Sequence, residues 1–267
     1  MDKLRLLMGK NLNKIGILSL KNPTMGEIID FYEDYDNIYY KYLSDVNTIT
    51  AMYDLEPFAH ILLVEHNLWF EDMDPWLYFI ETYETDASLQ KLFEWWTHRK
   101  FKRYESKDNK LYLYDSTDKY ILDQEGFKSI INYIKQINFM PINDKARVNF
   151  GKRTRTAKRY YKKRYEKLQK TKKDYSNVSF DSIISAISCK MNCSPSSLLN
   201  YTIYQIWDRY YRLSQIGTYD NMMLGYYTGN IKKKDINFNE INWAKTIIID
   251  RTKSAESGDT TFTVAHS

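Results

Sequence analysis

The spacing of hydrophobic and polar residues divides the chain into segments that are mostly helical. A short alternating stretch, Ile15 to Leu20, ends at Asn22-Pro23 and predicts a strand followed by a stop. Thr24-Met25-Gly26-Glu27 then has the Thr-x-x-Glu form of a capping box, in which two side chains satisfy exposed amides of a first helical turn. We expect this helix to end near Leu43 and to carry one apolar stripe of Ile28, Phe31, Tyr35 and Tyr39.

Three acidic residues are candidate helix starts in the next part of the chain. Asp54 can cap a helix that runs through Leu62 and His66. Asp74-Pro75 is an N-cap followed by a proline at the first helical position. Asp86 opens a further helix with one apolar face, made of Leu89, Leu92, Phe93 and Trp96. Neighbouring side chains on a helix point about 100° apart, so Trp95 and Trp96 cannot both lie in one narrow core stripe: either one of them lies at an interface, or the core face is broad.

The hydrophobic period changes from helical to two between Phe101 and Tyr114. The sequences KFKRYE and KLYLYD flank the turn-prone stretch Ser106 to Asn109, which predicts a hairpin, and Tyr120 to Leu122 can add a third strand. A helix follows, with Ile130, Ile131, Ile134 and Ile137 at core spacing. The expected fold class is therefore mainly α with a small β element (α+β).

The C-terminal part has the clearest helical pattern. Residues Phe180 to Lys190 form a predicted helix with Ile183, Ile184 and Ile187 inward, and Cys193 to Ser196 form a turn. We expect Ser197 to cap a second helix, and the two helices to pack as a hairpin. The apolar stripe of this second helix has spacings of four, three, four and three residues: Leu199, Ile203, Ile206, Tyr210 and Leu213.

Charge is concentrated in one segment, Lys145 to Lys173. It contains fourteen Lys and Arg against Glu166 as its one acid, a net charge of +13, whereas the whole chain of 267 residues carries +5 and the remainder therefore −8. The protein is an acidic body interrupted by one basic segment, which implies an anionic surface on a partner or on the chain itself. We expect an acidic, mainly helical domain at 1–143, a basic linker or helix at 144–178, a helical hairpin module at 179–250 and a flexible tail at 251–267.

The basic segment allows two interpretations. If residues 154–169 are helical, charges surround the whole circumference, so the segment cannot be a core helix. It is then a linker, or an arm that docks on an acidic protein surface. That surface belongs to the same chain, to a second copy of the chain in a homo-oligomer, or to another protein. Alternatively, cations interleaved with tyrosines bind phosphates and stack on bases of a nucleic acid. The contact candidates are Lys152, Arg153, Arg155, Lys158, Arg159, Tyr160, Tyr161, Lys162, Lys163, Arg164 and Tyr165.

Motifs for catalysis, cofactors or metals do not stand out. The sequence has no G-x-S-x-G, no phosphate-binding glycine loop and no G-x-G-x-x-G. Cys189 and Cys193 supply only half of a tetrahedral zinc site, so we expect reduced structural thiols. Glu65, His66, Glu71, Asp72 and Asp74 lack a metal-binding spacing and suit surface acids better. We therefore expect a protein that is not an enzyme and has no cofactor.

No stretch of the chain predicts a membrane segment or a leader. The N-terminal MDKLRLLMGK lacks the apolar core of a signal peptide, and the longest apolar run, Ile61 to Val64, is far short of the ~20 residues that span a bilayer. We expect a soluble intracellular protein.

Two stretches of the sequence resemble proteins encoded by tailed bacteriophages of Gram-positive hosts. In these proteins a small loop precedes a helix of the form L-T-x-Y-Q-x-x-D-x-[FY]-x-R, and here Tyr201 to Arg212 fits, with Tyr201 in the apolar position. The opening Asn22-Pro-Thr-Met-Gly-Glu-Ile is similar to their x-P-T-x-x-E-I start. A basic segment before the last hairpin is also usual among them.

The resemblance implies a tail-module protein. Such proteins are encoded near the tape-measure gene, which suggests a tail assembly chaperone for the tape-measure protein or a minor virion component. The implied partners are tape-measure or tube subunits in the host cytoplasm during assembly, and the virion is a second possible location. No functional residue is carried over, because the shared motifs are helix-packing patterns without a catalytic group.

Overall fold

The structure is a computed structural model of the chain. It describes residues 3–9, 14–15, 18–54, 62–63, 67–69, 72–106, 110–117, 119–140, 155–171, 179–238, 241–242 and 244. The predicted tail and the predicted end of the N-terminal domain at residue 143 lie outside these ranges.

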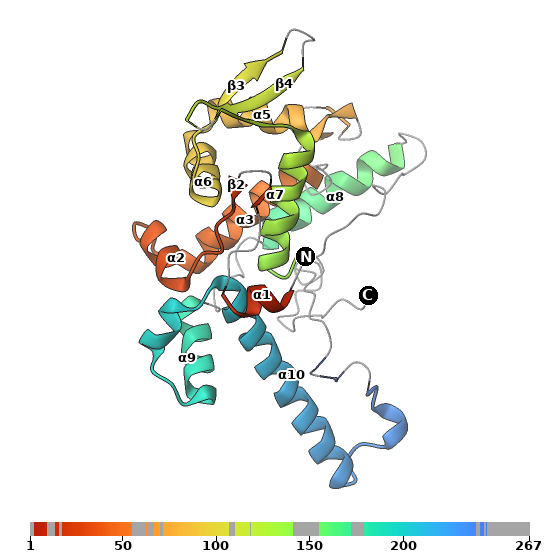
Figure 1. The fold of residues 1–267 in the computed structure, drawn as a ribbon. Coiled ribbons are helices and arrows are strands. Elements are labelled where there is room, and N and C mark those ends of the chain that lie inside the picture. The colour runs from red at the N-terminus through yellow and green to blue at the C-terminus, as the bar shows by residue number, and fades with distance from the viewer. Residues whose placement is uncertain are drawn as a thin grey trace.

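The protein is mainly helical and carries one small three-stranded antiparallel sheet, which confirms the α+β prediction (Figure 1). The helices are α1 (Lys3–Leu7), α2 (Met25–Phe31), α3 (Ile38–Asp54), α5 (Pro75–Thr85), α6 (Ala87–Thr97), α7 (Gln124–Ile137), α8 (Arg155–Thr171), α9 (Phe180–Met191) and α10 (Ile203–Tyr227), with the 3-10 helices η3 (Pro195–Asn200) and η4 (Lys233–Asp235). The described helices include none that is long and apolar enough to cross a membrane.

The sheet forms where the hydrophobic period is two, as predicted. Strands β3 (Lys102–Glu105), β4 (Leu111–Asp115) and β5 (Tyr120–Leu122) pair in that order, with Lys102 opposite Tyr114 and Leu113 opposite Leu122. A second, two-stranded element, β1 (Lys14–Ile15) with β2 (Leu18–Ser19), replaces the single strand expected from Ile15 to Leu20.

The capping box at Thr24 is confirmed, but the helix it opens is shorter than predicted. The Thr24 hydroxyl accepts from the Glu27 amide while the Glu27 carboxylate accepts from the Thr24 amide, and α2 ends at Phe31. The chain then turns through a polar stretch, and the Asn37 side chain accepts a 2.9 Å hydrogen bond from the Tyr40 amide at the start of α3. Tyr35 lies in this turn and is exposed, so the predicted four-residue stripe is wrong.

The structure places Asp54 at the end of α3, whereas the sequence predicts it as the cap of a following helix; residues 55–61 lie outside the described residues, and Leu62 and Leu63 are helical. Asp54 is the last residue of α3, and its carboxylate forms a 2.6 Å ion pair with the buried Lys135 ammonium of α7. The carboxylate therefore neutralises a buried cation, and breaking such a pair is costly.

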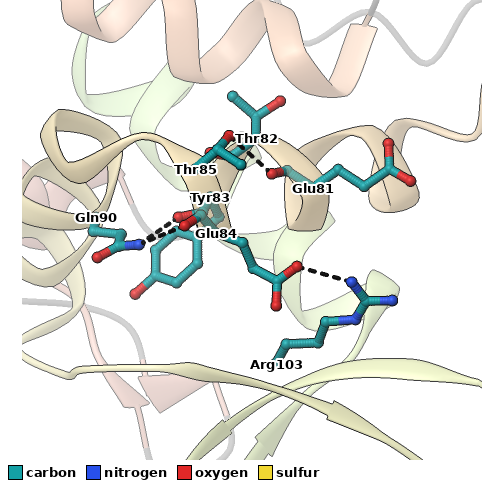
Figure 2. A network of polar contacts seen from close by, with 7 residues as sticks. All are labelled: Glu81, Thr82, Tyr83, Glu84, Thr85, Gln90 and Arg103. Carbon is teal, nitrogen blue, oxygen red and sulfur yellow. Dashed lines mark hydrogen bonds and ion pairs between the residues drawn. The ribbon is translucent and has the colours of Figure 1, made fainter.

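Helices α5 and α6 begin where the sequence predicts them. The Asp74 carboxylate accepts from the Trp76 amide, and the Asp86 carboxylate accepts from the Ser88 and Leu89 amides. Figure 2 shows how polar contacts join this pair of helices to the sheet: Gln90 of α6 donates to the Tyr83 carbonyl of α5 at 2.7 Å, and Arg103 of β3 pairs with Glu84 at 2.8 Å.

The adjacent tryptophans Trp95 and Trp96 have different surroundings. Trp96 is buried in the core. Trp95 is partly buried and stacks on Phe31, with 4.6 Å between ring centroids, while the Lys21 ammonium lies 4.9 Å from its ring centroid. Trp95 thus packs on the chain's own α2, as on a broad core face.

The N-cap of α10 is Thr202 and not Ser197, the residue that the sequence predicted. Thr202 caps α10 through a capping box with Gln205, whereas the Ser197 hydroxyl donates to the Ser194 carbonyl inside η3. Leu199 belongs to η3 and is partly exposed, so it is not part of the α10 stripe. The α9 prediction is confirmed, with Ile183, Ile184 and Ile187 buried.

One continuous core joins the N-terminal and C-terminal parts. The Tyr42 hydroxyl of α3 donates to Asn138 after α7 at 2.8 Å, and the Trp207 indole of α10 donates to the same amide oxygen at 3.4 Å. Phe139 stacks on Tyr204, with 4.7 Å between ring centroids. The domain boundaries stay a prediction, and the described parts on either side of the basic segment pack against each other.

Candidate functional site

The centre of the basic segment is a helix, α8, of 17 residues. Its Lys, Arg, Gln and Glu residues have high helix propensity, so local preference favours this structure. Lys152 and Arg153 lie outside the described residues, and so do the side chains of Arg164 and Tyr165.

A narrow apolar stripe attaches α8 to the rest of the protein. Ala157 and Tyr161, four residues apart, are 5% and 2% exposed, and Tyr161 packs in a small cluster with Leu62 and Leu63. The Lys158 ammonium donates to the Asn67 side chain at 3.0 Å. The expectation that charges surround the whole helix is therefore wrong, because the Ala157 and Tyr161 side chains are buried along one edge of it.

The opposite side of α8 is cationic. At 100° per residue, Arg155, Arg159, Lys162 and Lys163 project away from the Ala157–Tyr161 stripe, and all four are exposed. Tyr160 is 46% exposed beside them. The structure thus brings together five of the predicted contact residues, the four cations and Tyr160, on an outward surface, here called the cationic face. It places Tyr161 inside, where that ring is not available to a partner.

An apolar groove lies where three segments of the fold meet. It has a volume of about 520 Å³ and is formed by the α2–α3 turn, the start of α9, and η3. Apolar side chains from all three segments line it, and Asp36 and Asp181 are exposed carboxylates at its edge. The apolar lining residues are Ile29, Ile38, Tyr39, Phe180, Ile184, Pro195 and Leu199.

Sequence reasoning missed this groove because its lining comes from residues 29–39, 179–185 and 195–199. Periodicity considers each segment alone, and it predicts Tyr39 and Ile184 only as members of the apolar stripes of two separate helices. Their positions relative to one another depend on tertiary contacts between α2 and η3 and between α9 and η3.

The described part of the chain holds no cluster of side chains that suits a metal ion. No three His, Cys, Asp or Glu residues cluster there. Of the predicted acidic group, Asp74 caps α5 and Asp72 is exposed, while Glu65, His66 and Glu71 lie outside the described residues. Cys189 and Cys193 are free thiols.

Residues 169–248 match a family model described as the YomV second domain. YomV is a Bacillus phage-region protein, so the match links this part of the chain to a phage-associated domain. The matched residues include α9, η3 and α10, and with them the C-terminal wall of the apolar groove. No curated protein and no solved structure matches the chain.

Proposed function

We propose that the chain is a non-enzymatic phage tail assembly protein that acts as a chaperone for the tape-measure protein, with a place in the finished virion as the related role. The similarity of residues 169–248 to a phage-associated domain supports the phage context. The resemblance of its two helix-start motifs to tail-module proteins supports the tail role.

The cationic face of α8 is the observation that carries the proposal. Tyr161 and Ala157 fix the helix on one side, so Arg155, Arg159, Lys162 and Lys163 are presented as a preformed surface and not as a flexible tail. A preformed surface loses less conformational entropy when it binds. Its charge attracts an acidic protein surface and orients it on approach.

A tape-measure protein needs such a partner on physical grounds. It is a long helical chain with apolar stripes, and exposed apolar stripes of this kind associate in water until tube subunits cover them. A helper protein whose cationic face binds acidic residues of the tape-measure protein prevents the apolar stripes of different tape-measure molecules from associating. The acidic remainder of the helper repels other acidic chains, which keeps the complex soluble.

Co-expression with the tape-measure protein of the same phage tests the proposal. In the test variant Arg155, Arg159, Lys162 and Lys163 become Gln. In a matched control variant four exposed lysines elsewhere, Lys100, Lys102, Lys110 and Lys119, become Gln. We expect the parent and the control to keep the tape-measure protein soluble and to co-purify with it, and the test variant to lose both properties. Equal behaviour of all three proteins would contradict the proposal.

A second candidate, nucleic-acid binding, is favoured by one observation. The exposed ring of Tyr160 lies among the cations of α8, and aromatic rings beside cations stack on bases while the cations bind phosphates. This candidate predicts binding that weakens steeply with salt.

A further inference from the structure

The free end of α10 carries exposed apolar side chains. Leu224 is 62% exposed and Tyr227 is 76% exposed, and Tyr226 is also exposed. Large apolar side chains gathered at one site of a surface mark a contact with another molecule, whereas single ones do not. In Figure 1 this end of α10 projects from the rest of the protein.

Three lysines lie beside these apolar side chains. After α10 the chain folds back, so that the Ile231 amide donates to the Gly225 carbonyl at 3.0 Å. A Cβ added to Gly225 would meet the Cδ1 atom of Ile231 at 2.6 Å, so a larger residue at this position would force the Ile231 side chain to move. The fold-back places the exposed residues Lys232, Lys233 and Lys234 next to the helix end. We call Leu224, Tyr226, Tyr227 and these three lysines the α10 tip.

The α10 tip is complementary to the apolar groove in two respects. The groove is lined by apolar side chains such as Ile38 and Leu199, which suit Leu224 and Tyr227. Its edge carries the exposed carboxylates Asp36 and Asp181, opposite in charge to the lysines of the tip. Glu33 and Asp34, also exposed, extend the acidic charge along the α2–α3 turn.

The α10 tip of one molecule cannot fill the groove of the same molecule. Leu199 in the groove wall lies just before the start of α10, whereas Leu224 lies near the end of this continuous helix of 25 residues. At 1.5 Å per residue, the segment from Ile203 to Leu224 is about 30 Å long. The groove and the tip are therefore at opposite ends of one rigid rod.

We propose that the α10 tip of one molecule docks in the apolar groove of a second copy of the chain. Because the two surfaces differ, the contact is head-to-tail, and each added copy presents a new groove and a new tip. Successive copies form an open chain or a closed ring, according to the rotation between neighbours. The contact is small, which predicts dissociation constants in roughly the micromolar to millimolar range.

Light scattering after size-exclusion chromatography, at increasing protein concentration, tests the proposal. The tip variant carries Leu224→Ser and Tyr227→Ser, and the groove variant carries Asp36→Lys and Leu199→Lys. All four residues are at least partly exposed, so the fold is expected to survive, and circular dichroism checks this. A control variant changes the exposed Leu77 and Ile121, far from both surfaces in the sequence, to Ser.

We expect the mass of the parent and of the control to rise with concentration, while each variant alone stays a monomer. The decisive sample is an equimolar mixture of the tip variant and the groove variant. The tip variant keeps an intact groove, which accepts the intact tip of the groove variant. The other tip and the other groove are both altered, so we expect the mixture to form a dimer and no larger species.

Three outcomes would overturn the inference. They are a parent that stays monomeric up to about 1 mM, variants that associate as the parent does, and a mixture that stays monomeric. Added salt supplies a further check, because it weakens the contact between Lys232 to Lys234 and the acidic edge. The residues involved are distinct from the cationic face of α8, so failure here leaves the proposed chaperone role standing, and the reverse also holds.

Discussion

Thr24 and Thr202 lie opposite each other in an antiparallel β-bridge, and each is the N-cap residue of a helix. The Met25 amide donates to the Tyr201 carbonyl at 2.9 Å, and the Ile203 amide donates to the Pro23 carbonyl at 2.8 Å. The two motifs that carry the resemblance to tail-module proteins are thus two capping boxes in direct contact. Their shared presence has a structural reason, since α2 and α10 start from one bridge.

The Thr202 side chain is the first test of this arrangement. Its hydroxyl accepts from the Gln205 amide, and the Gln205 side chain in turn accepts from the Thr202 amide and donates to the Leu7 carbonyl. We expect Thr202→Ala to lower the free energy of unfolding by about 1 to 2 kcal/mol, the upper part of the range for caps, because the site is buried. Urea unfolding measures the loss.

Thr202→Ser is the matched control, because serine keeps the hydroxyl. It should retain most of the stability that Thr202→Ala loses. If the serine and alanine variants lose stability equally, the methyl group and not the cap hydrogen bond is the important feature.

The adjacent residues Tyr160 and Tyr161 give a second test. Tyr161 is 2% exposed and holds α8 on Leu62 and Leu63, whereas Tyr160 is 46% exposed. We expect Tyr161→Ala to release α8, at a cost of up to about 3 kcal/mol for its docking. Hydrogen exchange within α8 should become much faster, while α3 and α7 remain protected.

Tyr160→Ala is the control of the same chemistry at the next position. Its hydrogen exchange should resemble that of the parent. Similar rates for the two variants would show that Tyr161 does not anchor the helix.

The buried pair Arg99–Asp115 predicts a dependence of stability on pH. Burial alone raises the pKa of the Asp115 carboxyl, but the Thr117 amide hydrogen bond and the Arg99 guanidinium, 2.5 Å away, outweigh it and hold the pKa below its ordinary value. The folded pKa is then lower than the unfolded pKa, which is about 3.9. The resulting stability is fully present above the unfolded pKa and is lost as the pH falls through the folded pKa.

Unfolding of Asp115→Asn at several pH values measures this contribution. At neutral pH we expect the variant to be less stable by roughly 3 kcal/mol, because the ion pair between the Arg99 guanidinium and the buried Asp115 carboxylate is lost. The difference from the parent should shrink as the solution is acidified below about pH 4. A difference that stays constant down to the acid-unfolded state would rule out this account. Asp86→Asn changes an exposed capping carboxylate and serves as the comparison.

The sequence was sufficient where structure is decided locally. The caps at Thr24, Asp74 and Asp86 and the strands near Leu113 follow from side chains within a few residues of one another. Asp54 could not be placed in this way. A carboxylate before an apolar run resembles a cap, whereas in the structure Asp54 is the last residue of α3 and its carboxylate pairs with Lys135, far away in the sequence.

The candidate site depended more strongly on long-range packing. The sequence indicated the basic segment. A tyrosine among cations is expected to be exposed, however, and Tyr161 is buried because it packs on Leu62 and Leu63, which are far away in the sequence. The apolar groove had no local signal, because each of its walls looks like ordinary core. Periodicity indicated only the buried stripe of α10, which includes Ile203 and Ile206. It therefore did not identify the exposed residues at the α10 tip.

The last prediction separates the two candidate functions of the cationic face. If α8 binds acidic protein, the parent should bind DNA or RNA only in the non-specific range, with dissociation constants of about 10⁻⁴ to 10⁻⁶ M at physiological salt. Neutralising Arg155, Arg159, Lys162 and Lys163 should then abolish capture of the tape-measure protein. Tyr160→Ala should leave the weak nucleic-acid binding unchanged, since no base stacks on the ring. Fluorescence anisotropy over a range of salt concentrations measures the affinity. Tight binding that weakens by a logarithmic slope of about 0.9 per neutralised phosphate, and that Tyr160→Ala reduces further, would instead assign α8 to a nucleic acid.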